Sequence, residues 1–190
     1  RLLAPAMRAF PLVFHAVAHA TFATIPIVKT RGRASGGLAH MPQSPRADRM
    51  TQLTALVTGS SRGIGAATKS ALTARGVTVI GHASKAHDAE TIGADLTDPT
   101  AASRIWEEAL ARSAHGRIDV LVNNAGLFQA NPLSLSDIEW LDNWEDSLRI
   151  NLTAAAELSR FAVRHWLEGG ANGRIVRIAS RAAYRGDSPD

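Results

Sequence analysis

A glycine-rich loop, TGSSRGIG (residues 58–65), lies between a short β-rich run, LTALVTG (residues 53–59), and a helical stretch that extends to about residue 75. Glycine at three positions of this loop lets the backbone turn tightly and approach a ligand closely. A helix that begins directly after such a turn presents unpaired N–H groups and the positive end of its dipole, which together bind phosphate. The loop does not end in Gly-Lys-Ser/Thr, so it is not the phosphate-binding loop of nucleoside triphosphatases. The order strand, glycine loop, helix therefore predicts a site for a dinucleotide.

From Met50 onward, strand-like and helical segments alternate. After the first strand and helix we expect a strand at residues 77–81, a helix from Asp98-Pro99, a strand in IDVLVNNAG (residues 118–126), a long helix capped by Ser136 or Asn143 and reaching Trp166, and a last strand in GRIVRIAS (residues 173–180). The strands are unbroken apolar runs, as in parallel sheets that are covered on both faces. The pattern predicts an α/β fold with a doubly wound parallel sheet and right-handed crossovers.

The first 49 residues differ from the rest and account for the net positive charge of the chain. Residues 1–50 hold seven basic residues and one acid, whereas the remaining 140 residues hold fourteen basic and sixteen acidic residues. The main body therefore shows no nucleic-acid footprint. Three interpretations of this irregular leader stay open: a disordered or targeting segment with an Ala18-His19-Ala20 cleavage site, an over-extended gene start before Met50, or a membrane anchor within residues 9–28. Prolines and histidines interrupt the apolar run and disfavour the anchor.

The motifs, taken together, resemble those of the short-chain dehydrogenase/reductase family. These are the glycine loop, Asn123-Asn124-Ala125-Gly126, Asn151 and the strand end Ile-Ala-Ser180, and the resemblance covers residues 51 to about 186. It implies a Rossmann-type domain over residues 50–190 and hydride transfer between a nicotinamide cofactor and an alcohol or carbonyl substrate. No Cys is present, so a Cys-ligated metal site is excluded, and we expect no metal.

The resemblance also implies roles for single residues. Asn151 would hold, through its backbone, a water of the proton relay, although an amide satisfied inside the core would look the same in sequence. Ser180 would hydrogen-bond the substrate oxygen. The candidate cofactor-binding residues are Gly59, Ser61, Arg62, Gly63, Ile64, Gly65, His82, Ser84, Lys85, Asp95, Leu96, Asn123, Ala125 and Gly126. For the Asn-Asn-Ala-Gly segment a plain polar turn is the alternative, and for Asp95 a plain surface carboxylate.

The end of the second strand bears on the choice of cofactor. An acidic residue there would accept hydrogen bonds from the ribose 2′-hydroxyl and favour NAD. The chain has His82, Ser84 and Lys85 instead, with no carboxylate before Asp88, and Arg62 adds a second cation nearby. A 2′-phosphate needs donors and positive charge, so we expect NADP(H) rather than NAD.

The catalytic tyrosine is the part of the resemblance that is missing. The family pairs Tyr with Lys as Tyr-x-x-x-Lys some way after the serine, but Tyr184 follows Ser180 too closely and Ser188 stands where its lysine would be. We therefore expect an amino-terminal fragment, truncated before this motif, incomplete on the carboxy-terminal side of the sheet and inactive alone. The last strand would then lie on a sheet edge, and Arg177 within it would lie at the covered edge or in solvent. The complete protein would be a cytoplasmic homo-oligomer; the alternative is a non-catalytic dinucleotide-binding sensor or scaffold.

Overall fold

The computed structural model describes residues 52–180. The leader (residues 1–49), Tyr184 and Ser188 lie outside the described residues, so the interpretations placed on them stay predictions.

A five-stranded parallel sheet forms the centre of the fold, in the order β3-β2-β1-β4-β5. The strands are β1 (Thr54–Val57), β2 (Thr78–Ala83), β3 (Thr91–Gly93), β4 (Val120–Asn123) and β5 (Arg174–Arg177). This order confirms the predicted Rossmann-type α/β fold. Sequence reasoning missed β3, which has only three residues and follows a polar segment. The strand β5 lies at an edge of the described sheet, as predicted.

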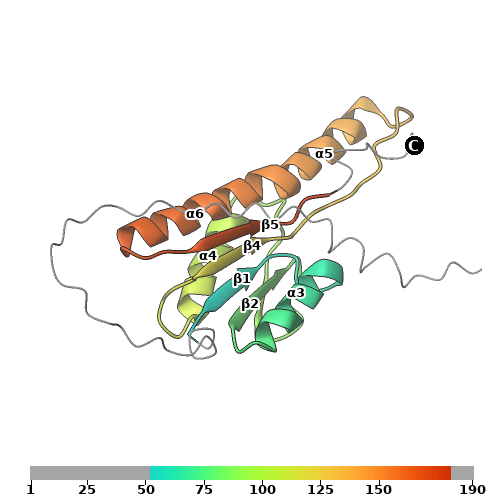
Figure 1. The fold of residues 1–190 in the computed structure, drawn as a ribbon. Coiled ribbons are helices and arrows are strands. Elements are labelled where there is room, and N and C mark those ends of the chain that lie inside the picture. Colours follow the sequence, from blue (N-terminus) through green and yellow to red (C-terminus); the bar gives the residue numbers. More distant parts are fainter. Residues whose placement is uncertain (1–51, 181–190) are drawn as a thin grey trace, which may run out of the picture.

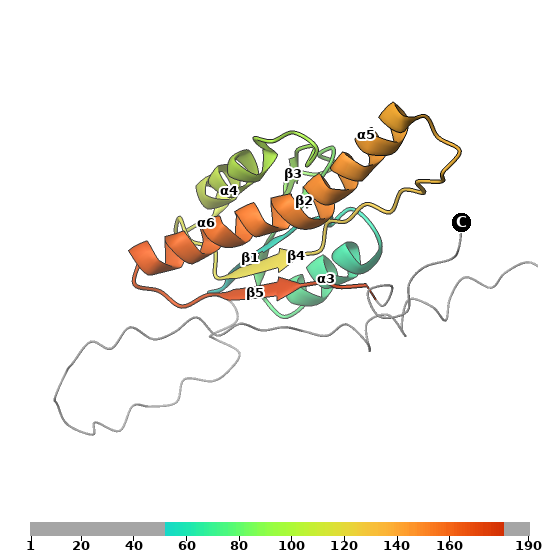
Figure 2. The same ribbon diagram turned by 90° about the horizontal axis from the view of Figure 1, so that it is seen from above.

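Helices cover both faces of the sheet. The helical elements are α3 (Gly63–Thr73), α4 (Ala101–Arg112), α5 (Asp137–Leu148), the π-helical turn η1 (Arg149–Thr153) and α6 (Ala154–Glu168). Figure 2 shows α3 on one side of the sheet and α4 and α6 on the other. The sheet is therefore doubly wound, as the alternating pattern predicted.

Two apolar clusters fill the space between these layers. One joins the sheet to α4 and α6 and includes Leu56, Leu158 and Trp166; the other lies on the opposite face and includes Ala55 and Val57. The three β1 residues in these clusters are fully buried although they alternate between the two faces. Burial on both faces explains why the strands read as unbroken apolar runs.

Ser136, and not Asn143, caps the long helix, which begins at Asp137. Ser136 and Glu139 form a reciprocal capping box, in which the Ser136 hydroxyl accepts from the Glu139 N–H and the Glu139 carboxylate accepts from the Ser136 N–H. Helix α5 continues through η1 into α6 as one rod, and α5 extends beyond the ends of the strands (Figure 1). Within residues 52–180, none of the helices has both the length and the apolarity to cross a bilayer.

Candidate functional site

A cleft opens at the carboxyl ends of β1 and β4, where the strand order reverses. Parallel α/β sheets bind their ligands at this switch point. The cleft has a volume of about 380 Å³. It is lined by Gly59, Ser61, Arg62, Ile64, Gly65, His82, Ala83, Ser84, Ala94, Asp95, Leu96, Asn124, Ala125, Gly126, Leu127 and Ile150.

Most of the predicted cofactor residues lie on this wall, and a few do not. Gly63, Lys85 and Asn123 are absent from the lining, and so are the two predicted catalytic residues, Asn151 and Ser180. Sequence reasoning missed five lining residues: Ala83, Ala94, Asn124, Leu127 and Ile150. The assignment of cofactor contacts to single residues stays a prediction.

The glycine loop uses its glycines for two different physical reasons. Gly59 and Gly63 have φ of +65° and +55°, a backbone region that favours glycine. Gly65 instead permits close packing, because a Cβ there would lie 2.1 Å from the Gly59 carbonyl oxygen. The loop and the first turn of α3 are therefore held against each other backbone to backbone.

The amino terminus of α3 lies open toward the cleft. Arg62, which precedes the helix, makes no side-chain cap, and the first turn contains no acidic residue. The N–H groups of this turn are therefore not capped by a side chain, which leaves them for an anionic group at the positive end of the helix dipole. This part of the cleft fits a pyrophosphate.

Asn124 joins the carboxyl end of β4 to the glycine loop. Its side-chain amide donates to the carbonyl oxygens of Thr58, at 2.9 Å, and Gly59, at 3.0 Å. The hydroxyl of Thr58 in turn accepts from the backbone N–H groups of Asn124 and Ala125. Asn123, which sequence reasoning chose as the cofactor residue, is buried, and its amide donates to Ala155 and Ser159 of α6. Asn123 thus joins the end of β4 to helix α6, whereas Asn124 joins it to the glycine loop.

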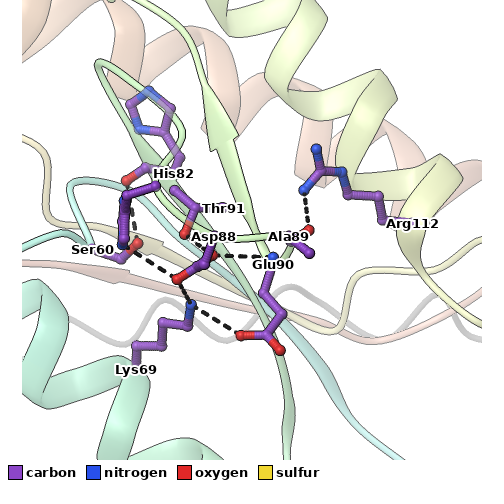
Figure 3. Close-up of polar contacts among 9 residues, drawn as sticks. Ser60, Lys69, His82, Asp88, Ala89, Glu90, Thr91 and Arg112 are labelled. Atoms are coloured by element: carbon purple, nitrogen blue, oxygen red, sulfur yellow. Dashed lines mark hydrogen bonds and ion pairs between the residues drawn. The ribbon is translucent and has the colours of Figure 1, made fainter.

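His82 supports the glycine loop from β2. Its Nδ1 accepts from the Gly59 N–H at 3.4 Å and its Nε2 donates to the Ala94 carbonyl at 2.9 Å. The backbone carbonyl of His82 also accepts from Ser60 (Figure 3). Burial lowers the pKa of His82, opposed in part by the Ala94 hydrogen bond and by Asp95. The ring is therefore neutral near pH 7, and both of its nitrogens have partners inside the protein.

Asn151 lies in the π-helical turn beside the cleft. Its side-chain oxygen accepts from the Leu127 N–H and its amide donates to the Leu127 carbonyl, both at 2.8 Å. The Arg177 guanidinium of β5 donates to the backbone carbonyl of Asn151. Arg177 thus has a defined partner, which the sequence alone did not indicate.

The fold and this cleft together define a nucleotide-binding domain of the Rossmann type. The sequence profile of the short chain dehydrogenase family matches residues 53–188. The chain is 36% identical over 144 residues to the 3-oxoacyl-(acyl-carrier-protein) reductase FabG of Escherichia coli K12, covering 70% of this chain and 57% of the reductase. It is 34% identical over 151 residues to a sorbitol dehydrogenase of Cereibacter sphaeroides, covering 74% of this chain and 57% of that protein.

A solved structure gives the same result. A short chain dehydrogenase of Burkholderia cenocepacia, in complex with NADP, matches with a TM-score of 0.61 and 34% identity over 74% of this chain and 60% of that one. The chain belongs to the short-chain dehydrogenase/reductase family. It spans 57% of the length of the two relatives named above.

Proposed function

We propose that this chain forms the NADP(H)-binding part of an oxidoreductase that transfers hydride between nicotinamide and an alcohol or carbonyl group. The observation that carries the proposal is the cleft at the switch point of the sheet, with the uncapped amino terminus of α3 on its wall. When bound, the cofactor would supply the hydride chemistry. The residues of this chain would hold its pyrophosphate at α3 and its adenosine end beside Asp95 and Leu96.

The preference for NADP rests on the chemistry at the end of β2. His82 and Ser84 stand on the cleft wall where an acidic residue would favour NAD, and Arg62 lies on the opposing glycine loop. Lys85, which follows Ser84, adds a second cation at this end. A 2′-phosphate is doubly charged near pH 7 and would be held by Ser84, Arg62 and Lys85, because both ring nitrogens of His82 already have partners inside the protein. The NADP complex of the Burkholderia relative agrees with this assignment.

Two residues would serve the reacting end of the site. Ser180 would hydrogen-bond the substrate oxygen, and Asn151 would support the proton relay through its backbone carbonyl. Two hydrogen bonds between the Asn151 side chain and the backbone of Leu127 hold the π-helical turn in place beside the cleft. Tyr184, the single tyrosine of the sequence, has Ser188 and not lysine four residues later. Since a proton donor of lowered pKa is needed when hydride reaches a carbonyl, we expect residues 1–190 alone to show no turnover.

We further propose that the complete protein lies in the cytoplasm and associates with copies of itself. Helix α5 and η1 expose several large apolar side chains, among them Leu141, Trp144 and Leu152 at 51%, 49% and 57% exposure. An exposed apolar row of this kind is typical of an interaction surface. Light scattering on the purified chain tests this, and a strictly monomeric chain at high concentration argues against it.

Cofactor titration of the 190-residue chain tests the proposed function. We expect NADP to bind more tightly than NAD, and Arg62→Met to weaken NADP binding while NAD binding changes little. When the chain is incubated with NADPH and a panel of carbonyl compounds, we expect no steady oxidation of NADPH. Equal affinity for the two dinucleotides contradicts the cofactor assignment, and no binding of either contradicts the proposed function. Binding without any activity in a complete homologue would favour the sensor or scaffold.

A further inference from the structure

The segment between β2 and β3 borders the adenosine end of the cleft. Its first residue, Ser84, lies on the cleft wall, and residues 84–90 are exposed. Lys85, the proposed phosphate ligand, belongs to this segment. The position and charge of residues 84–90 therefore bear directly on whether the site takes a 2′-phosphate, provided that the proposed function is right.

A lysine from α3 holds the far end of this segment. The Lys69 ammonium lies 3.2 Å from a carboxylate oxygen of Asp88 and 3.4 Å from one of Glu90. The Lys69 side chain is only 18% exposed, so its charge is partly withdrawn from solvent. Figure 3 shows the amine pointing between the two carboxylates. One cation from a helix thus pairs with both acids of the segment.

Asp88 transmits this contact to the edge strand β3. Its other carboxylate oxygen accepts from the Glu90 N–H and from the hydroxyl of Thr91, the first residue of β3, which is fully buried. The Thr91 hydrogen bond is also the largest cause of the lowered pKa of Asp88, so the carboxylate stays charged at neutral pH. The backbone closes the turn, since the Glu90 carbonyl accepts from the Gly81 N–H at 2.8 Å.

An arginine from the opposite face of the sheet holds the same residues. Arg112 of α4 donates to the Ala89 carbonyl at 2.9 Å (Figure 3). Because α3 and α4 cover opposite faces of the sheet, residues 88–90 are fixed from both sides. The rest of the segment, which includes Lys85, is therefore attached to residues whose positions are fixed.

We infer that Lys69 is a positioning residue that sets the preference for the 2′-phosphate. It does so in two ways: it fixes the position of residues 88–90 at the end of the segment, and it neutralises the acids Asp88 and Glu90. Without Lys69 the segment would keep the charges of Asp88 and Glu90 but lose their shared lysine partner, and only His87, 3.3 Å from Asp88, would remain beside them. The uncompensated negative charge would lie on the segment whose first residue, Ser84, lines the cleft, and it would disfavour a 2′-phosphate, whereas the NAD ribose carries no such charge. Lys69 would therefore act on NADP and leave NAD nearly unaffected.

The test measures dissociation constants of NADP and NAD for the full chain and its variants. Lys69→Met should lower the preference for NADP over NAD about three- to tenfold, the size of a partly screened charge interaction near the surface. Lys69→Arg should retain the preference. Arg164→Met, which removes an exposed ion pair with Glu168 on α6, is the matched control and should change nothing. Lys69→Gln, which keeps a donor but no charge, is measured in case the Met variant does not fold, and should lose part of the preference.

The outcomes separate this inference from the function on which it rests. A wild-type chain without NADP preference overturns the cofactor assignment, and the inference with it. A preference that both Lys69→Met and Lys69→Gln leave intact overturns the inference alone. Equal weakening of NADP and NAD in these variants also overturns it, because that is the result of a merely structural role.

Discussion

Replacing Gly65 by alanine tests how the glycine loop is held. The new Cβ would lie 2.1 Å from the Gly59 carbonyl oxygen and 2.5 Å from the Asn124 amide nitrogen. Ordinary contact begins at 3.4 Å, so the backbone of the loop and of α3 must separate by 1.3 Å, the difference between 3.4 and 2.1 Å. The first contact is with backbone, and the Asn124 amide is held by two hydrogen bonds to the loop, so neither can move aside without cost.

The expected cost follows from three contributions. Overpacking costs about 1–3 kcal/mol. The two hydrogen bonds from Asn124 to the loop would break, at about 1 kcal/mol each. Alanine is better than glycine within a helix by about 1 kcal/mol, which offsets part of this. We expect the free energy of unfolding to fall by about 2–4 kcal/mol in urea titrations followed by circular dichroism.

Gly63 provides the matched control, because it is two residues away and a Cβ added there would meet no atom within 4 Å. Its only restriction is a φ of +55°. Gly63→Ala should cost about 1–2 kcal/mol, the strain of a left-handed residue, and Gly63→Asn less, because Asn tolerates this region. If Gly65→Ala costs no more than Gly63→Ala, the close approach of Gly65 to Gly59 is not what holds the loop.

Three further outcomes are expected. Below pH 6.5 the chain should lose stability: the lowered pKa of His82 means that the unfolded state binds the proton first, so the melting temperature should fall between pH 7.5 and 5.5, and less so in His82→Gln. Gly173→Ala should destabilise by about 1–3 kcal/mol in urea, because its Cβ would lie 1.8 Å from the buried Trp166 ring; an unchanged midpoint would refute this contact. Arg177→Ala should cost about 1 kcal/mol by removing the hydrogen bond to the Asn151 carbonyl, and a Lys variant should recover part of it.

The fold was predictable because each main element has a strong local signal. The apolar runs, the glycine loop and the Ser136 cap each fix one element, and the alternation of strand and helix allows few topologies. The strand β3 escaped because it has only three residues, and its burial comes from pairing with β2. Its identity as a strand is a tertiary property, which no window of sequence contains.

The lining of the cleft was predicted in outline, and the places where it differs from the prediction depend on the tertiary fold. Sequence reasoning chose Asn123 from two adjacent asparagines, but strand alternation sends the Asn123 amide to α6 and leaves Asn124 at the glycine loop. Counting side-chain alternation from Val122 would have separated the two. Arg177 and Lys69 could not be predicted, because their partners lie on elements whose positions depend on the complete fold.

The arrangement around the glycine loop explains how this cleft can be open and yet ordered. Parallel strands end at one edge and leave their last carbonyls without ladder partners. Here the Asn124 amide takes those of Thr58 and Gly59, while His82 accepts the Gly59 N–H. These hydrogen bonds fix the loop on the side away from the cleft. They leave the first turn of α3 without a side-chain cap. The N–H groups that an anion needs are thus held in place before it binds, so that binding does not have to order the loop, a condition that favours affinity.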